Sequence, residues 1–372
     1  MKNLNIAMIG HRFMGKAHSN AYLNVNKFFD LKAKPIRKII CGRSNDVIAF
    51  AENWGWENYC HNYNDAVKRD DVHIVDICTP NSSHAEIAIA AANAQKAILC
   101  EKPLAMNVTE AEEMVAAAEE NNVPTMVCFN YRRVPAIALL KKMIDEGKLG
   151  RVYHFRARYL QDWIMDPKFP RVWRLVKALA GSGVHGDLNA HIIDLARFLV
   201  GEITNVSGLS ETFINERPLE NSDSNETGIV DVDDATLFLA QFKNGAIGTF
   251  EATRFGGGNK NGLQLEINGS KGSFKFNLEN MNELFYLNLD ENEQGFKRIL
   301  VTEPEHPYVG NFWPPGHIIG YEHTFVNLIA DFINGVAERT PLMPDFKDAL
   351  KTQKVLDAVI KSAEERCWMK IY

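Results

Sequence analysis

The chain predicts a two-domain protein of the α/β class, with a doubly wound parallel sheet first and an α+β domain with a large open antiparallel sheet second. Three observations predict this architecture. The 372 residues exceed what one hydrophobic core usually supports. Over the first third, short apolar strands alternate with helices, and after about Arg133 strands follow one another across tight turns. We therefore expect one domain over residues 1–130 and another over residues 131–372.

The strands expected in the first domain are apolar without polar alternation, which is typical of a parallel sheet covered by helices on both faces. The expected strands are 4–9, 36–41, 74–78, 97–100 and 125–129. The expected helices are 14–27, 47–54, 84–94 and 109–121. Thr109 and Glu112 have the spacing of a capping box and predict where the last of these helices begins.

The second domain is expected to contain a mostly antiparallel sheet and few helices. Residues 152–161 alternate as a half-exposed strand, and Lys243-Asn244-Gly245 and Asn268-Gly269 supply hairpin turns further on. The other expected strands are 203–212, 234–242, 246–254, 262–269 and 272–277. Helices are expected at 135–146, 185–199 and 346–365, and the polar residues 222–228 are expected to form a mobile loop.

The composition excludes several classes of protein. A formal net charge of −6 argues against a nucleic-acid partner, which needs a basic face. The sequence contains neither a run of about 18 apolar residues nor a signal-peptide pattern, so we expect no membrane partner and a cytoplasmic location. The six cysteines stand singly, without a Cys-x-x-Cys or Cys/His cluster. They are expected to be buried thiols, with no disulfide and no metal site.

A glycine loop predicts a dinucleotide site. Gly10 and Gly15 bracket His11-Arg12-Phe13-Met14, directly between the first expected strand and the first expected helix. In such a loop the first glycine allows a tight turn, the last allows close helix packing, and the helix N-terminus faces the pyrophosphate. Arg12 replaces the usual middle glycine, and its side chain either points outward or pairs with the phosphates. The residues expected to contact the cofactor here are Gly10, Phe13, Met14 and Gly15.

The end of the second strand normally distinguishes NAD from NADP. A carboxylate there binds the ribose 2′-hydroxyl of NAD, and a nearby arginine accommodates the 2′-phosphate of NADP. Here the chain reads Cys41-Gly42-Arg43-Ser44 and has no carboxylate at that point. Arg43 can pair with a phosphate or stack on adenine, and Ser44 can hydrogen-bond a phosphate oxygen. The expected cofactor is therefore NAD(P), with NADP favoured over NAD.

Two further segments carry side chains suited to proton transfer. Glu101-Lys102-Pro103 follows the fourth expected strand, at the edge where a doubly wound sheet binds its ligand. Asp187, His191 and Asp194 are spaced by four and three residues, so a helix would place them on one face. A carboxylate and an imidazole one turn apart suit general acid–base catalysis. Oxidation of an alcohol needs such a group, which removes the hydroxyl proton while a nicotinamide accepts the hydride.

Taken together, these motifs resemble the Gfo/Idh/MocA family of oxidoreductases over nearly the whole chain. The matching segments are the loop 10–15 followed by Ala17-His18, then Thr79-Pro80-Asn81 with His84, Glu101-Lys102-Pro103, and the helix with Asp187, His191 and Asp194. The resemblance implies that Lys102, Asp187 and His191 form the catalytic group, with His191 or Lys102 accepting the substrate proton. It also implies that the cofactor is lined by Thr79, Pro80, Asn81, His84, Glu101, Lys102 and Asn130. The family often has a glycine where this chain has Asn189.

Four segments resemble, more closely, the levoglucosan dehydrogenases of that family. They are Phe129-Asn130-Tyr131-Arg132-Arg133, Tyr159-Leu160-Gln161-Asp162-Trp163, Val230-Asp231-Val232-Asp233-Asp234 and Glu251-Ala252-Thr253-Arg254. Aromatic side chains offer a flat apolar face to a sugar ring, and polar side chains hydrogen-bond its hydroxyls. The expected substrate-binding residues are Arg132, Tyr159, Gln161, Asp162, Trp163 and Arg254. The resemblance implies a sugar, anhydrosugar or inositol-like polyol as the substrate.

Other activities fit the same motifs. The chain could reduce or oxidise a different substrate, such as a trans-dihydrodiol, a biliverdin-like ring or a keto-sugar nucleotide. A glycosidase that uses NAD with no net redox change shares the expected fold, and so does a non-catalytic dinucleotide sensor.

The sheet of the second domain predicts self-association. We expect one of its faces to expose Phe238, Leu239, Phe242 and Phe250. An open apolar face of this kind usually pairs with another copy of the chain, so a homodimer or homotetramer is expected.

Overall fold

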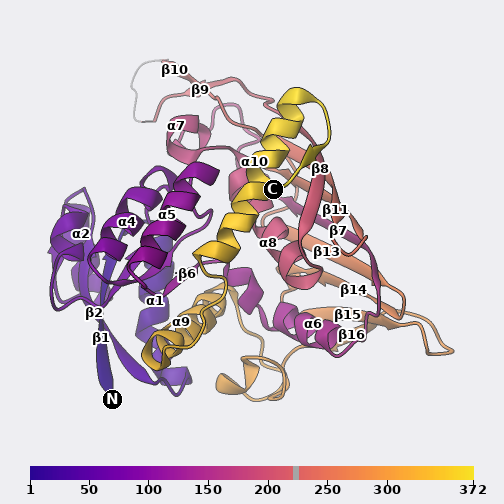
Figure 1. Cartoon of the computed structure of the whole chain (residues 1–372), viewed down its shortest axis with the longest axis horizontal. Coiled ribbons are helices and arrows are strands. Elements are labelled where there is room, and N and C mark those ends of the chain that lie inside the picture. Colours follow the sequence, from indigo (N-terminus) through magenta and orange to yellow (C-terminus); the bar gives the residue numbers. More distant parts are fainter. Residues whose placement is uncertain (221–225) are drawn as a thin grey trace. The chain divides into compact units, whose positions relative to one another are not determined.

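The computed structural model describes residues 1–220 and 226–372, which divide into two units. The first unit comprises Met1–Arg133 and Ile319–Lys351, and the second comprises Val134–Ile318 and Thr352–Tyr372. A single boundary at residue 130 did not anticipate the return of Ile319–Lys351 to the first unit. The reason is packing, because helix α9 (Tyr321–Glu338) lies against α1 (Phe13–Phe28) within that unit (Figure 1).

A six-stranded parallel sheet forms the centre of the first unit. Its strand order is β3-β2-β1-β4-β5-β6. The strands are β1 (Lys2–Ile9), β2 (Ala33–Cys41), β3 (Tyr59–Cys60), β4 (Ile74–Ile77), β5 (Ala97–Cys100) and β6 (Thr125–Val127). The order reverses between β1 and β4, which is the point where doubly wound sheets bind their ligands. The five predicted strands are present, and β3 is added; two residues are too few for a hydrophobic pattern to reveal.

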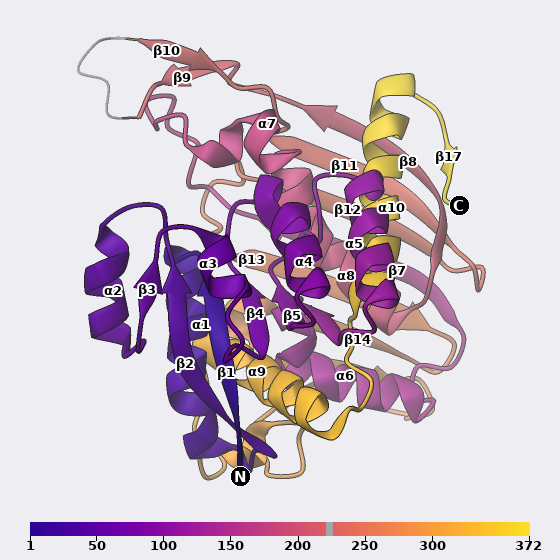
Figure 2. The same ribbon diagram turned by 60° about the vertical axis from the view of Figure 1, so that its left-hand side comes forward.

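Helices cover this sheet, and Figure 2 shows α4 and α5 side by side in front of β4 and β5. Besides α1 and α9, they are α2 (Asp46–Trp54), α3 (Tyr63–Val67), α4 (His84–Asn93) and α5 (Val108–Glu120). The predicted capping box at Thr109 is wrong. Helix α5 begins one residue earlier, because the side chain of Asn107 accepts a hydrogen bond from the backbone N–H of Glu110.

A nine-stranded sheet dominates the second unit. Its order is β16-β15-β14-β13-β7-β12-β11-β8-β17, and every neighbouring pair is antiparallel except β7 and β12, which are parallel. The strands are β7 (Val152–Leu160), β8 (Ile203–Glu211), β11 (Ala235–Phe242), β12 (Ile247–Thr253), β13 (Gly262–Gly269), β14 (Gly272–Asn277), β15 (Glu283–Asn288), β16 (Lys297–Leu300) and β17 (Met369–Lys370).

The prediction that one face of this sheet exposes Phe238, Leu239, Phe242 and Phe250 is wrong for three of these residues. Phe238, Phe242 and Phe250 are buried on the inner face, and Leu239 alone of the four predicted residues is exposed. Side chains alternate between faces along a strand, so residue 239 and residues 238 and 242 must point to opposite sides. Phe238 and Phe250 are paired across β11 and β12, and their rings stack with centroids 4.3 Å apart.

The helices of the second unit are short apart from its last. They are α6 (Pro135–Asp145), α7 (Lys177–Ala180), α8 (Ala190–Leu199) and most of α10 (Phe346–Glu365). The predicted helix 185–199 is α8 preceded by a π-helical turn, η4 (His185–Asn189), so it is not one regular helix. Part of the predicted loop 222–228 lies outside the described residues, and its last two residues belong to β10 (Thr227–Ile229), which pairs with β9 (Glu216–Pro218).

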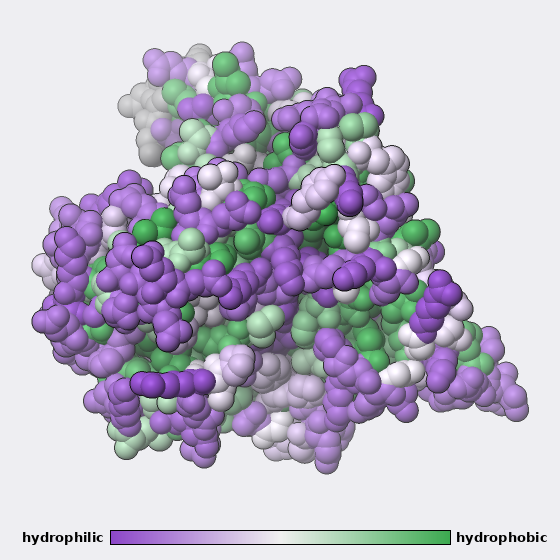
Figure 3. Space-filling model, in the orientation of Figure 1, coloured by the Kyte–Doolittle hydropathy of each residue, from purple (hydrophilic) through white to green (hydrophobic). Residues whose placement is uncertain are grey.

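Hydrophilic side chains cover most of the surface over α2 and α4 in the view of Figure 3. Among the described residues, none of the helices combines the length and apolar character needed to cross a membrane.

Candidate active site

The glycine loop has the geometry that a dinucleotide requires. Gly10 follows β1 with φ of 108°, and a Cβ there would lie 2.5 Å from the carbonyl oxygen of Cys78. A Cβ on Gly15 would lie 2.3 Å from the carbonyl oxygen of Gly10. Neither position has room for a side chain, and α1 begins at Phe13 without a side-chain cap on its first N–H groups. These exposed N–H groups at a helix N-terminus suit a pyrophosphate.

A cluster of polar side chains lies where β2 ends. A Cβ on Gly42 would be 2.2 Å from Nδ1 of His11, so the imidazole fills the place of a side chain at the strand tip. Nε2 of His11 is 2.8 Å from Asp46 Oδ1, Arg12 Nη1 is 2.8 Å from Asp46 Oδ2, and Ser44 also donates to Asp46. The hydroxyl of Ser44 and the imidazole of His11 lower the pKa of Asp46. Arg12 thus points away from the loop, toward a carboxylate.

The sequence did not single out His11 or Asp46 for this cluster. Asp46 is the first residue of α2 and has the appearance of an ordinary acidic residue at a helix N-terminus. One feature of the sequence could have indicated Asp46. It lies a few residues after the second strand, close to the position that normally carries the ribose-binding carboxylate.

The loops after β4 and β5 are joined by His84. Its ring is buried, with Nε2 3.0 Å from the carbonyl oxygen of Thr79 and Nδ1 3.0 Å from that of Pro103. Burial lowers the pKa of His84. Thr79 and Lys102 are partly exposed at this edge, and Pro80 and Asn81 are equally accessible. Of the residues expected to line a cofactor here, His84 therefore lies beneath the surface and supports those above it.

His18, on α1, is fully buried between two carboxylates. Its Nδ1 is 2.9 Å from Asp76 Oδ2, and its Nε2 is 3.0 Å from Glu101 Oε1. Burial lowers the pKa of His18, but the charge and hydrogen bond of Asp76, together with the nearby Cys78 and Cys128, raise it well above the ordinary value. The imidazole therefore donates from both nitrogens. Cys78 and Cys128 complete two groups of metal-ligand type around His18, but the hydrogen bonds already account for both ring nitrogens, and we assign no metal to them.

Glu101 is also engaged on its other side. Its Oε2 accepts a hydrogen bond of 3.1 Å from the backbone N–H of Lys102, and only 4% of the residue is exposed. Glu101 was expected to line the cofactor. Its carboxylate instead connects His18 to the backbone that carries Lys102.

Asn130 and Arg132 lie in the first unit, in η2 (Asn130–Arg133), and both are buried. Asn130 Nδ2 donates to Thr324 Oγ1 at 2.9 Å, and Arg132 Nη2 is 2.7 Å from Asp348 Oδ2. Each side chain thereby connects η2 to the returning segment Ile319–Lys351. Arg132, expected to bind substrate, has its charge balanced within the first unit.

In the second unit, η4 and α8 carry the residues expected to act in acid–base catalysis. Asp187 is partly exposed, whereas His191 and Asp194 are buried to 6% and 1% exposure. The His191 ring lies 6.0 Å from that of Tyr159, measured between centroids. A π turn is frequent at functional sites because it displaces one side chain out of the α-helical register. Here the displaced turn is the one that bears Asp187.

An ion pair fixes the orientation of Asp187. Arg254 Nη2 is 2.7 Å from Asp187 Oδ2, and Arg174 Nε is 4.0 Å from the same oxygen. The guanidinium of Arg254 also lies 5.0 Å from the ring centroid of Trp163. Arg254 is 1% exposed, so this pair is held in a low-dielectric environment. Arg254 thus holds the carboxylate of Asp187, and the same guanidinium lies over the indole of Trp163.

The remaining expected substrate residues surround the same indole. Nε1 of Trp163 donates to Gln161 Oε1 at 2.8 Å. Tyr159 Oη and Gln161 Nε2 both donate to Asn261 Oδ1, at 2.5 and 3.3 Å. Asp162 pairs with Lys260 at 2.8 Å, which lowers the pKa of Asp162. Four of the six predicted residues, Tyr159, Gln161, Trp163 and Arg254, thus form one connected group in the second unit, and Asn261 is a member that the sequence did not indicate.

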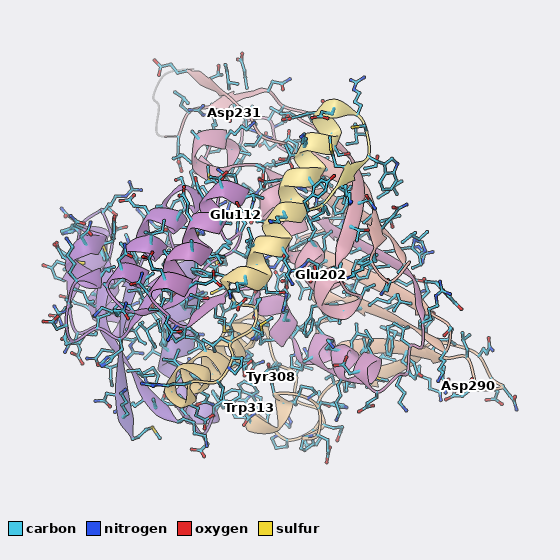
Figure 4. All side chains as sticks on the ribbon, in the orientation of Figure 1. Glu112, Glu202, Asp231, Asp290, Tyr308 and Trp313 are labelled. Atoms are coloured by element: carbon cyan, nitrogen blue, oxygen red, sulfur yellow. The ribbon has the colours of Figure 1, made fainter. Side chains whose placement is uncertain are left out.

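The three carboxylates of the Val230-Asp231-Val232-Asp233-Asp234 motif accept hydrogen bonds from backbone N–H groups. Asp233 accepts hydrogen bonds from the backbone N–H groups of Gly183 (2.6 Å) and His185 (2.8 Å), at the start of η4. Asp231, labelled in Figure 4, accepts one from Lys177, where α7 begins. Asp234 accepts from Phe213 and Ile214. These carboxylates hold backbone in place.

A glycine loop suited to a dinucleotide in one unit, and a carboxylate and an imidazole four residues apart in the other, are the features of a nicotinamide-dependent oxidoreductase. The chain belongs to the Gfo/Idh/MocA family. Residues 4–129 match the family model described as an oxidoreductase family, NAD-binding Rossmann fold, and residues 137–275 match the GFO/IDH/MocA C-terminal domain. The protein is an NAD(P)-dependent dehydrogenase, as its curated relatives are.

Several relatives cover the whole chain, and three of them show how similar it is to known proteins. Levoglucosan dehydrogenase of Pseudarthrobacter phenanthrenivorans is 42% identical over 100% of this chain and 99% of its own. An oxidoreductase domain protein from Kribbella flavida is 50% identical, with a TM-score of 0.97 and full coverage of both chains. A levoglucosan dehydrogenase solved in complex with NADH and levoglucosan is 43% identical, with a TM-score of 0.96 and full coverage of both.

Proposed function

We propose that this dehydrogenase oxidises a secondary hydroxyl of a sugar, anhydrosugar or inositol-like polyol. The observation that carries the proposal is Asp187, which is held by Arg254 and lies four residues before His191, with the Arg254 guanidinium over the ring of Trp163. An aromatic face with hydrogen-bonding groups at its edge is what a polyhydroxylated ring needs. The name of the full-length relative supports levoglucosan as the first substrate to try.

The protein's own side chains carry out the proton transfer of the reaction. A bound nicotinamide would accept the hydride from the carbinol carbon. His191 or Lys102 then accepts the hydroxyl proton, and Asp187 accepts a hydrogen bond from a neighbouring hydroxyl. Because Asp187 is paired with Arg254, it orients the ring and does not act as the base.

The cofactor that we propose is NAD. Asp46 presents a negative charge at the end of β2, where a 2′-hydroxyl can donate to it and a 2′-phosphate would be repelled. Arg12 and Ser44, which a phosphate would use, are already engaged with Asp46. NADH in solved complexes of a levoglucosan dehydrogenase supports the same choice. For these reasons we propose NAD, although Arg43 and Ser44 in the sequence favoured NADP.

We also propose that the protein is a cytoplasmic homodimer or homotetramer. Its six cysteines are free, as a reducing compartment would keep them. The outer face of the nine-stranded sheet exposes Leu209, Leu237, Leu239 and Ile247 beside a hollow of about 1050 Å³. Apolar groups exposed on several adjacent strands favour pairing with a second copy.

The test is absorbance at about 340 nm, where the reduced nicotinamide absorbs, with NAD and NADP separately against levoglucosan, inositols, aldoses and polyols. A rise with one sugar class supports the proposal. Cleavage of a glycoside without net reduction of cofactor would instead identify the redox-neutral glycosidase. The absence of any turnover, with cofactor bound, would refute the proposed substrate class.

Lys102→Ala and His191→Ala should each lower kcat by about a hundredfold or more, the usual effect of a positioned acid–base group. The affinity for NAD, measured by fluorescence titration of NADH, should stay close to that of the wild type. A variant that keeps the wild-type rate would remove that residue from the proton transfer.

A further inference from the structure

Cys41 and Cys60 are paired directly across two neighbouring strands. β2 and β3 are parallel, lie side by side in Figure 2, and align Cys41 with Cys60 as the last residue of each strand. Partner residues at the same register point to the same face of a sheet, so the two thiols face each other. Neighbouring strands are about 4.8 Å apart, which falls within the Cα separation that a disulfide spans. The sequence, in which the two cysteines stand singly, does not reveal this pair.

The two thiols differ in a way that suits oxidation. Cys41 is 3% exposed, whereas Cys60 is partly accessible and donates to the carbonyl oxygen of Asn62 at 3.4 Å. The interaction between the thiols lowers the pKa of Cys60 and raises that of Cys41. An accessible thiol with a lowered pKa, next to a second thiol, is the arrangement that oxidants select. Cys78, Cys100 and Cys128 are buried instead, and burial raises the pKa of each.

We propose that Cys41 and Cys60 are a redox-active dithiol that a peroxide oxidises to a disulfide, and that this disulfide weakens dinucleotide binding. The thiolate of Cys60 attacks one peroxide oxygen and forms a sulfenic acid, with hydroxide as the leaving group. The thiol of Cys41 then attacks the sulfenic sulfur, forms the S–S bond and releases water. The proton that Cys60 lost on forming the thiolate neutralises the hydroxide, so two thiols and one hydrogen peroxide give one disulfide and two waters.

The pair adjoins the residues that we assign to the ribose end of the cofactor. Gly42 follows Cys41, its N–H donates to the carbonyl oxygen of Cys60 at 3.0 Å, and its carbonyl oxygen is 2.9 Å from His61 Nδ1. His11 lies against Gly42 and hydrogen-bonds Asp46. A disulfide needs Cβ atoms closer than two strand neighbours normally have, so its formation would move Gly42 and the His11–Asp46 pair with it. This effect on binding depends on the proposed function, because it assumes that a dinucleotide occupies this edge.

The experiment treats the full chain with hydrogen peroxide and then measures two quantities. Peptide mass spectrometry of the alkylated protein should find Cys41 and Cys60 in one linked pair, lighter by two hydrogens, and dithiothreitol should reverse the link. Titration with NADH should give a Kd about tenfold higher for the oxidised protein, the cost of one hydrogen bond to a charged group. Cys60→Ser, and Cys41→Ala as a second variant, should abolish both changes. Cys367→Ser, which removes an exposed cysteine elsewhere, should retain both.

Three outcomes would overturn the inference. Cys41 and Cys60 could both remain open to alkylation at peroxide levels that oxidise Cys367. Cys60 could oxidise to a sulfinic acid without a link to Cys41. The disulfide could form while the Kd for NADH stays unchanged. If the reduced wild type binds no NADH at all, the proposed cofactor site fails instead, and the mass measurement still decides whether the dithiol reacts.

Discussion

Gly42 directly follows β2, and the carboxylate often found at that position is supplied by another residue. Standard dinucleotide folds place a carboxylate at this strand tip. Here the imidazole of His11 occupies the space, so only glycine fits, and the carboxylate comes from Asp46 in the following helix. His11 fills the gap and at the same time hydrogen-bonds the replacement. A negative charge therefore remains at the ribose end although the strand itself carries none.

Asp46→Asn should raise the Kd for NAD by about tenfold and lower the Kd for NADP, because a ribose hydroxyl loses a charged acceptor and a 2′-phosphate loses a repulsive charge. Fluorescence titration with NADH and NADPH measures both. Glu52→Gln is the matched control, since it removes an exposed carboxylate from the same helix and should change neither Kd. Equal changes for the two cofactors would show that Asp46 does not distinguish them.

His18→Gln should destabilise the protein by about 3 kcal/mol, because it leaves the buried carboxylates of Asp76 and Glu101 without their cation. The pKa of His18 is raised in the folded state, so its contribution is complete below the unfolded value of about 6.5 and is lost as the pH rises through the folded value. Urea unfolding at about pH 6 and pH 9 measures the difference between wild type and variant, which should be larger at pH 6. A difference that does not depend on pH would mean that His18 is neutral.

Among elements, the π turn η4 is the clearest departure from what the sequence predicted. Spacings of four and three residues predict a regular helix, and periodicity cannot show that the backbone at its start is bound from outside. Asp233 lies far along the chain, and its carboxylate accepts two N–H groups of the segment leading into η4. A Cβ on Gly183 would lie 1.9 Å from the carbonyl oxygen of Asp233, so the two backbones are in close contact.

Asp233→Asn should lower kcat more than it changes KM for the sugar, because η4 loses an anionic acceptor and Asp187 loses its fixed position. The free energy of unfolding should fall by about 1–3 kcal/mol, the usual cost of an unsatisfied buried donor. Steady-state kinetics and urea unfolding measure the two effects. Asp231→Asn, in the same motif but bonded to Lys177, should affect kcat less. A loss of stability alone, with kcat retained, would make Asp233 purely structural.

The local patterns predicted most of the helices and strands but missed helix α9 (Tyr321–Glu338) and strands β15 (Glu283–Asn288) and β16 (Lys297–Leu300). Alternation, turns and the glycine loop depend on near neighbours, and the predicted sheets and the Asp187–His191 helix follow from them. The contacts that the sequence could not supply join residues far apart in the chain. Asp348 to Arg132, Asn261 to Tyr159 and Cys60 to Cys41 are examples, since nothing near either partner indicates the other.

At the scale of the whole molecule, the nine-stranded sheet has one face buried in the protein's own core and one face exposed. The alternation that buries Phe155, Phe238 and Phe250 necessarily turns Leu237 and Leu239 outward. Charged pairs such as Arg156 with Glu266 lie on the same outer face. Apolar and charged groups that are both organised across adjacent strands resemble an interface core with a polar rim more than an ordinary protein surface.

Leu239→Glu should shift the protein toward monomers, because it buries a charge without a partner if a second copy covers this face. Light scattering after size exclusion, at micromolar concentration, measures the mass. Leu289→Glu makes the same chemical change at an exposed leucine outside the hollow and should leave the mass unchanged. A wild type that is already monomeric would contradict self-association through any face. A wild type that is oligomeric, with Leu239→Glu equally so, would place the interface elsewhere, and the exposed leucines of β11 would then need another partner.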